Sequence, residues 1–183
     1  MWAKVLNLDA QPPRHAQIQK ALRWIAGILE EMEVPFQVVG GLAAQVYGAT
    51  RPLVDIDLYI PNDCFDEVRL RVKECVTFGP EHVKNPTWDI TFMALDYEGE
   101  RIELGGAEGT KIFDRHMQRW TQEEIDFTKA ERRTIYGVEV PVMPRARLID
   151  YKRKLSRRVD LDDIREMEAA DQTAPGSVSP RTA

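Results

Sequence analysis

The segment that most constrains the fold is residues 54–60, where apolar and acidic residues alternate. A period of two is typical of a half-buried β-strand, because successive side chains on a strand point to opposite faces. Asp55 and Asp57 should therefore lie side by side on one face. We expect the apolar residues that alternate with them to point into the core from the other face: Val54, Ile56 and Leu58.

Hydrophobic periodicity and turn residues divide the rest of the chain into helices and strands. Helical spacing predicts helices over residues 18–32, 42–47 and 64–75, and two more that begin near residues 144 and 160. Strand-type runs are predicted at 36–39, 88–97, 101–104, 134–135 and 138–142. Glu98-Gly99-Glu100 and Tyr136-Gly137 are expected to turn two β-hairpins between these strands. Asp160 is expected to cap the last helix.

These elements predict an α/β (α+β) fold, with a short mixed β-sheet flanked by helices and followed by a C-terminal helical segment. We expect residues 1–143 to form the main domain and residues 144–170 to form helices packed on it. Residues 171–183 turn to Thr, Pro, Gly and Ser, which predicts a disordered tail.

Composition and charge are those of an ordinary globular protein. Of the 183 residues, 43% are hydrophobic and 30% are charged. The net charge of −5 gives no general attraction to nucleic acid, although a local basic patch could still hold a phosphate-bearing ligand. No apolar run approaches the length of a membrane span, and the N-terminal stretch lacks a secretory signal. Cys64 and Cys75 form no CxxC motif, so we expect a cytoplasmic protein with reduced thiols.

The acidic pair is the first candidate for chemistry. Two carboxylates held side by side next to apolar residues repel each other, and a divalent cation relieves that repulsion. Mg²⁺ (or Mn²⁺) prefers carboxylate oxygen and bridges to substrate phosphates. Alone, the Asp55-x-Asp57 pattern also fits an exposed acidic strand face.

The glycine pair Gly40-Gly41 is the second candidate. It falls where a predicted strand meets a predicted helix, and glycine lets backbone amides approach a phosphate with no side chain in between. The pair and the two aspartates are separated by a short helix and a loop that contains Arg51. Together they indicate a phosphate cradle beside a metal site.

These residues resemble the signature of the DNA polymerase β-like nucleotidyltransferase superfamily. The matching motifs are Gly40-Gly41-x-Ala43, Gly48-x-x-Arg51 and Asp55-Ile56-Asp57, joined by a C-terminal stretch that runs from Met143-Pro144 through Lys152 to Arg157, Asp160, Asp163 and Ile164. The pattern is similar to the small bacterial branch that contains abortive-infection and toxin–antitoxin proteins and the aminoglycoside and lincosamide nucleotidyltransferases. The resemblance covers roughly residues 36–60 and 143–166, and it implies that residues 1–143 are the catalytic domain.

The resemblance also implies a third carboxylate on a neighbouring strand. Glu103 lies on the predicted return strand between Ile102 and Leu104, which matches the layout of the superfamily, although Glu stands where the superfamily has Asp. Asp89 is the alternative. The resemblance further implies that Gly40, Gly41, Arg51 and Lys152 bind the nucleotide.

The implied activity is metal-dependent transfer of a nucleoside monophosphate from a nucleoside triphosphate to an acceptor hydroxyl, with release of pyrophosphate. ATP is the nucleotide that the resemblance suggests. The acceptor stays open between a small molecule such as an antibiotic, a protein, and RNA such as a tRNA end, and so does a toxin–antitoxin partner. The alternative from another class is a nucleotidyltransferase-like binding or antitoxin module that has lost catalysis.

Overall fold

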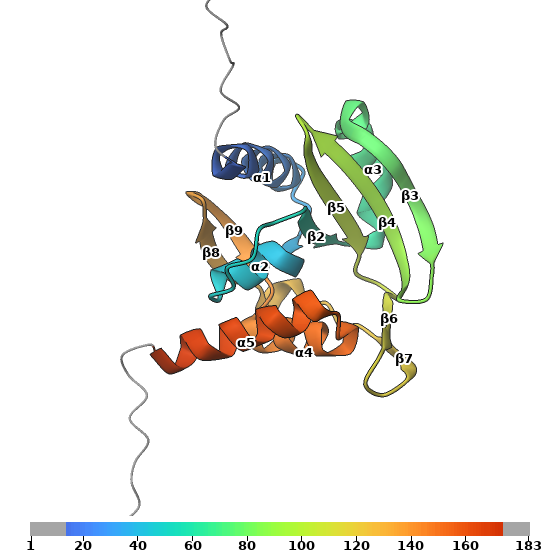
Figure 1. Ribbon diagram of the computed structural model, residues 1–183. Coiled ribbons are helices and arrows are strands. Elements are labelled where there is room, and N and C mark those ends of the chain that lie inside the picture. Colours follow the sequence, from blue (N-terminus) through green and yellow to red (C-terminus); the bar gives the residue numbers. More distant parts are fainter. Residues whose placement is uncertain (1–13, 174–183) are drawn as a thin grey trace, which may run out of the picture.

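The computed structural model describes residues 14–173, which fold as a mixed sheet with helices packed around it (Figure 1). The α-helices are α1 (Arg14–Glu31), α2 (Gly40–Val46), α3 (Phe65–Arg71), α4 (Arg145–Leu155) and α5 (Arg158–Thr173). The strands are β1 (Gln37–Val38), β2 (Ile56–Ile60), β3 (Val76–Lys84), β4 (Trp88–Tyr97), β5 (Glu100–Gly106), β6 (Lys111–Asp114), β7 (Arg119–Gln122), β8 (Glu131–Ile135) and β9 (Val138–Val142). Short 3-10 turns cover Asn62–Cys64, Lys73–Cys75 and Phe127–Lys129. The predicted α/β (α+β) class is confirmed.

The sheet runs in the order β7-β6-β4-β5-β2-β1-β9-β8, with β3 paired along most of the long strand β4, from Asp89 to Leu95. Two neighbouring pairs are parallel, β2 with β5 and β1 with β9, and the other pairs are antiparallel. Both predicted hairpins are present, as β4–β5 and β8–β9. The centre of the sheet is therefore β5-β2-β1, where segments distant in the sequence meet.

The helices cover the sheet with their apolar stripes. Helix α1 lies across β5 and β9 and buries Ile18, Leu22, Ile25 and Leu29, the residues whose spacing predicted it. Helices α4 and α5 lie side by side below α2, and α3 packs against β3 (Figure 1). No helix within residues 14–173 combines the length and the apolar character needed to cross a membrane.

The pairing of β2 with β5 fixes which side chains enter the core. Ile56 lies opposite Ile102 and Leu58 opposite Leu104, and all four are buried almost completely. Asp57 lies opposite Glu103 in the same register, so both point to the other face. The hydrophobic alternation thus positions the two carboxylates.

Some expectations differ from the structure at the ends of strands. Val54 is 68% exposed, and not in the core, because β2 begins only at Ile56 and the preceding residues form a loop. Strand β3 was not predicted, because Gly79-Pro80 in its middle is a turn signal. The β3–β4 register shifts between Phe78 and Glu81, and an edge strand tolerates such a break. The short strands β6 and β7 were not predicted either.

A buried ion cluster joins α4 to α5. Lys152 is only 1% exposed, and its Nζ lies 2.8 Å from Oδ2 of Asp163 and 3.5 Å from Oδ1 of Asp160. Both aspartates are buried as completely as the lysine. Asp160 also accepts a hydrogen bond from the backbone N–H of Arg157 at 3.1 Å, so it caps the start of α5 from within the first turn. Helix α5 continues through Asp171 to Thr173, and the rest of the predicted tail lies outside the described residues.

The ion cluster gives a stability prediction. Lys152→Met would leave two buried aspartates without their shared cation, so we expect it to lower the free energy of unfolding by about 3–5 kcal/mol in urea titrations. Arg153→Met is the matched control, because Arg153 is exposed and pairs with Glu168 on the surface. We expect that control to cost less than about 1 kcal/mol. Equal losses in the two variants would contradict a buried structural role for Lys152.

Candidate active site

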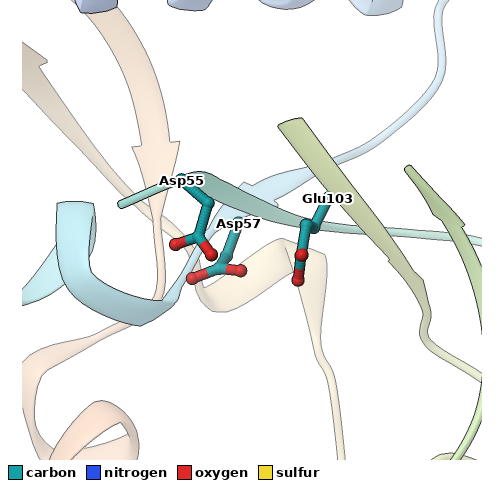
Figure 2. A group of neighbouring side chains, drawn as sticks. All are labelled: Asp55, Asp57 and Glu103. Atoms are coloured by element: carbon teal, nitrogen blue, oxygen red, sulfur yellow. The ribbon is translucent and has the colours of Figure 1, made fainter. Parts of the chain in front are cut away.

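Three carboxylates converge at the centre of the sheet. Asp57 comes from β2, Glu103 from the parallel strand β5, and Asp55 from the residue just before β2. One carboxylate oxygen of each lies within 4.8 Å of those of the other two. Figure 2 shows the three side chains leaving their strands on the same side and pointing toward one another. The structure thus brings together the aspartate pair and the glutamate that the sequence singled out.

The electrostatics of this acidic trio favour a bound cation. Loss of hydration, followed by the negative charges of Asp55 and Glu103, raises the pKa of Asp57 to about 7, and the positive charges of Lys152 and Arg157 oppose that rise. Crowded carboxylates resist simultaneous ionisation unless a positive charge joins them. An all-oxygen set suits a hard ion, so the residues present fit Mg²⁺ or Mn²⁺.

Asp89, the alternative third carboxylate, belongs elsewhere. Glu103 lies opposite Ala94 of β4, so the even-numbered residues of β4 share its face. Asp89 has an odd number and therefore points to the opposite side of the sheet. There its carboxylate forms ion pairs with Lys84 at 2.8 Å and His82 at 2.9 Å. Glu103 instead accepts a hydrogen bond of 2.6 Å from Nε of Arg101 on the site face. The geometry therefore favours Glu103 over Asp89.

The glycine pair shapes the site by making room. Gly40 has a φ of +65°, and a Cβ atom there would overlap Oδ2 of Asp57. A Cβ atom at Gly41 would come to 2.5 Å from Nη2 of Arg51. The N–H of Val39 donates to the carbonyl of Asp57 at 2.9 Å, which ties the turn to β2. Glycine is needed here for the packing of the site residues themselves, a reason that the sequence did not reveal.

The trio opens into a cleft of about 490 Å³. Gly40, Gly41, Arg51 and Arg157 also line this cleft. Further lining residues come from β2, β3, β4, the β3–β4 loop and α4, and include Tyr59, Val83, Asn85, Trp88, Ile90, Phe92 and Tyr151. Tyr59 could have been found, because it lies two residues beyond Asp57 and shares its strand face.

Buried aspartates of α5 hold the two arginines of the cleft. Arg51 Nε lies 2.9 and 3.1 Å from the two carboxylate oxygens of Asp163. Arg157 donates from Nε at 2.7 Å and from Nη2 at 3.1 Å to Asp160. Lys152 touches both aspartates but does not line the cleft. In this structure the ammonium of Lys152 faces the two aspartates, and the expected contact between Lys152 and the nucleotide stays a prediction. Burial turns its ammonium toward the aspartates, and Arg157 takes the position that faces the cleft.

Comparison with solved structures identifies the fold. A candidate nucleotidyltransferase from Thermotoga maritima matches with a TM-score of 0.64 at 20% identity, over 88% of this chain and 98% of that one. LnuA, a lincosamide antibiotic adenylyltransferase solved with lincomycin bound, gives 0.55 at 14% identity, with 83% and 97% covered. ANT(2″)-Ia in complex with adenylyl-2″-tobramycin gives 0.52 at 17% identity, with 86% and 94% covered. No model of a known protein family matches the chain, and neither does any curated protein sequence.

These similarities define the fold of the chain. The chain has the nucleotidyltransferase fold, as its motifs had indicated, and the fold includes the aminoglycoside and lincosamide adenylyltransferases among its examples. The acidic trio lies within that fold as a candidate metal site.

The raised pKa of Asp57 gives a pH prediction for the metal-free protein. The pKa rises from 3.8 to about 7 on folding, so the stability that protonated Asp57 contributes is present below pH 4 and lost as pH rises to 7. Asp57→Asn should therefore raise the melting temperature in EDTA at pH 8 by about 3 °C or more, as roughly 1 kcal/mol would do. The gain should shrink at pH 5.

Asp89→Asn is the control for that experiment. Lys84 lowers the pKa of Asp89, so the ionised form is already stabilised and the substitution should give no gain at pH 8. A melting temperature of Asp57→Asn that is unchanged at pH 8, or equally raised at both pH values, would contradict the repulsion inferred for the trio.

The close packing of Gly40 against Asp57 gives a third prediction. Gly40→Ala should displace the Asp57 carboxylate and weaken Mn²⁺ binding, measured by calorimetric titration, by about tenfold or more, equivalent to 1.4 kcal/mol. Gly27→Ala is the matched control, because a Cβ atom in that part of α1 meets nothing within 4 Å. That control should leave Mn²⁺ binding unchanged and raise stability by about 0.5–1 kcal/mol. Undiminished Mn²⁺ binding by Gly40→Ala would show that the close approach has no role in the site.

Proposed function

We propose that the chain transfers a nucleoside monophosphate, with ATP as the favoured donor, from a nucleoside triphosphate to an acceptor hydroxyl. The observation that carries this proposal is the convergence of Asp55, Asp57 and Glu103, whose carboxylate oxygens lie within 4.8 Å of one another. The same cleft is lined by Arg51 and Arg157. The nucleotidyltransferase fold supports it, since known adenylyltransferases share this architecture.

The residues at one end of the cleft suit the triphosphate. We assign the β- and γ-phosphates to the Gly40-Gly41 turn and to Arg51 and Arg157, whose guanidinium groups are held in place by buried aspartates. Each arginine keeps part of its side chain exposed, with 25% for Arg51 and 45% for Arg157, so donors remain free for phosphate oxygens. Lys152 contributes by fixing both aspartates.

Asp55, Asp57 and Glu103 would hold Mg²⁺, which supplies charge neutralisation at the α-phosphate and at the leaving oxygen. Glu103 would accept the proton of the acceptor hydroxyl. A bond forms between that oxygen and the α-phosphorus, the bond to the bridging oxygen of the β-phosphate breaks, and pyrophosphate leaves toward the two arginines. The ion pair with Arg101 holds the Glu103 carboxylate at 2.6 Å, which restricts its orientation.

The alternative is a nucleotide-binding or antitoxin module without catalysis. A lost or displaced third carboxylate would have favoured it, whereas Glu103 lies in register with Asp57 and completes the trio. We therefore place the enzyme first. The candidates for its acceptor are an antibiotic, as for the structural neighbours, a protein hydroxyl, and a tRNA hydroxyl, as in toxin systems. Cytoplasmic location and a toxin–antitoxin partner remain predictions from the sequence.

Glu103→Gln separates the two functions. The substitution removes the proton acceptor and weakens one metal ligand, so pyrophosphate release from ATP and Mg²⁺ in the presence of acceptor should fall by about a hundredfold or more. Binding of α,β-methylene-ATP with Mg²⁺ should change by less than about tenfold, since both aspartates and both arginines remain. Asp55→Asn with Asp57→Asn should abolish both. A wild-type protein that binds the analogue yet never releases pyrophosphate with any acceptor class would support the binding module.

A further inference from the structure

The position of the acceptor follows from in-line geometry. In such a displacement, the attacking oxygen approaches the α-phosphorus opposite to the leaving group. The cations that suit the leaving pyrophosphate are Arg51 and Arg157, both held by aspartates of α5, and Arg51 lies against the Gly40-Gly41 turn. These groups therefore lie together on the α5 side of the cleft. The acceptor must therefore enter from the other side, past Glu103. That side is formed by β3 and β4, which extend the sheet beyond β5.

This side of the cleft is an apolar wall. The pairing of β4 with β5 places Phe92 opposite Gly105, so Phe92 shares the strand face of Glu103, and Ile90 and Trp88 follow at alternate positions. Val83 on β3 lies opposite Ile90 and continues the same face. All four residues line the cleft: Val83, Trp88, Ile90 and Phe92. We call them the β3–β4 wall.

Gly105 and two tyrosines form the floor beside this wall. A Cβ atom at Gly105 would lie 2.9 Å from both Ile90 and Tyr59, so glycine lets these side chains close the floor. Tyr151 from α4 also lines the cleft, and its ring centroid lies 6.0 Å from that of Trp88. Each tyrosine hydroxyl can donate one hydrogen bond and accept others.

The charge of the cleft limits what can bind there. Among the described residues that line it, the acidic ones are Asp55, Asp57 and Glu103. A divalent cation on the trio would neutralise these carboxylates, and the remaining charged lining residues are arginines. The four residues of the β3–β4 wall carry no charge, and beside them lies one exposed carboxylate, that of Glu81, opposite Phe92 and outside the cleft lining. An acceptor with several ammonium groups, such as an aminoglycoside, would therefore find too little countercharge along the wall to match them.

We propose that the β3–β4 wall is the acceptor subsite and that it takes an uncharged hydroxyl compound with an aromatic or apolar body. Such a compound would lie flat against Phe92, Ile90 and Trp88, offer one hydroxyl to Glu103, and form hydrogen bonds with the tyrosine hydroxyls of the floor. This inference rests on the proposed function and deepens it by naming the substrate class. It separates the chain from the neighbour solved with adenylyl-2″-tobramycin.

A pair of glycosides with identical sugar hydroxyls provides the test. Phenyl β-D-glucopyranoside, methyl β-D-glucopyranoside and tobramycin are titrated into the full chain saturated with Mg²⁺ and α,β-methylene-ATP, with binding followed by NMR. The phenyl glycoside should bind about tenfold or more tightly than the methyl glycoside, because burial of the ring against the wall adds apolar contact. Tobramycin should bind more weakly than the phenyl glycoside.

Variants then assign the preference to the wall. Phe92→Ala should remove most of the preference for the phenyl glycoside, and Val83→Ser, a milder change on an outer strand, should reduce it. Trp120→Ala is the matched control, because this exposed aromatic lies on the β6–β7 hairpin and does not line the cleft; it should leave the preference intact. Unchanged affinity for the ATP analogue shows that each variant is folded.

Three results would overturn the inference: equal binding of the two glycosides, tighter binding of tobramycin, or a preference retained in both Phe92→Ala and Val83→Ser. In each of these cases the proposed function stands if wild type binds the ATP analogue with Mg²⁺ and Asp55→Asn with Asp57→Asn does not. Failure of wild type to bind the analogue would instead contradict the proposed function itself.

Discussion

Mutual repulsion among Asp55, Asp57 and Glu103 is the constraint around which the centre of the molecule is arranged. The core residues of β2 and β5 hold the carboxylates together, since Ile56 and Leu58 cannot stay buried unless Asp57 faces the cleft beside Glu103. Hydrophobic burial therefore supplies the free energy that keeps like charges close. Loss of hydration at Asp57, together with the charges of Asp55 and Glu103, raises the pKa of Asp57, and a cation would offset both effects.

A second group of charged residues is buried in the C-terminal helices. Asp160 and Asp163 are buried and each binds one arginine of the cleft, while Lys152 neutralises both from inside the helix pair. A guanidinium fixed by a carboxylate loses less conformational freedom when it meets a phosphate. The C-terminal helices thus supply the carboxylates that hold the arginines of the cleft. The predicted boundary near residue 144 coincides with the start of α4, and residues on both sides of it contribute to the cleft.

The sequence predicted those features that depend on local periodicity. Strand alternation predicted that Asp55 and Asp57 lie together. The resemblance to the superfamily, and not periodicity, indicated that Glu103 on the return strand of the hairpin around Gly99 would lie beside them. The surroundings of Lys152 could not be predicted in the same way, because its partners are reached only when α4 packs on α5. The exposure of Val54 and the course of β3 through Gly79-Pro80 depend on where strand pairing begins and breaks, which sheet contacts decide.

The two ends of the cleft are built from different parts of the chain, and this separation bears on how the fold serves different acceptors. Gly40, Gly41, Arg51 and the α5 aspartates form the part of the cleft that we assign to the phosphates. Their contacts constrain one another closely, since a Cβ atom at Gly41 would already meet Arg51. The β3–β4 wall consists of side chains on outer strands, where a substitution alters the cleft surface without disturbing the acidic trio. Acceptor preference can therefore differ between proteins of this fold while the nucleotide chemistry stays the same.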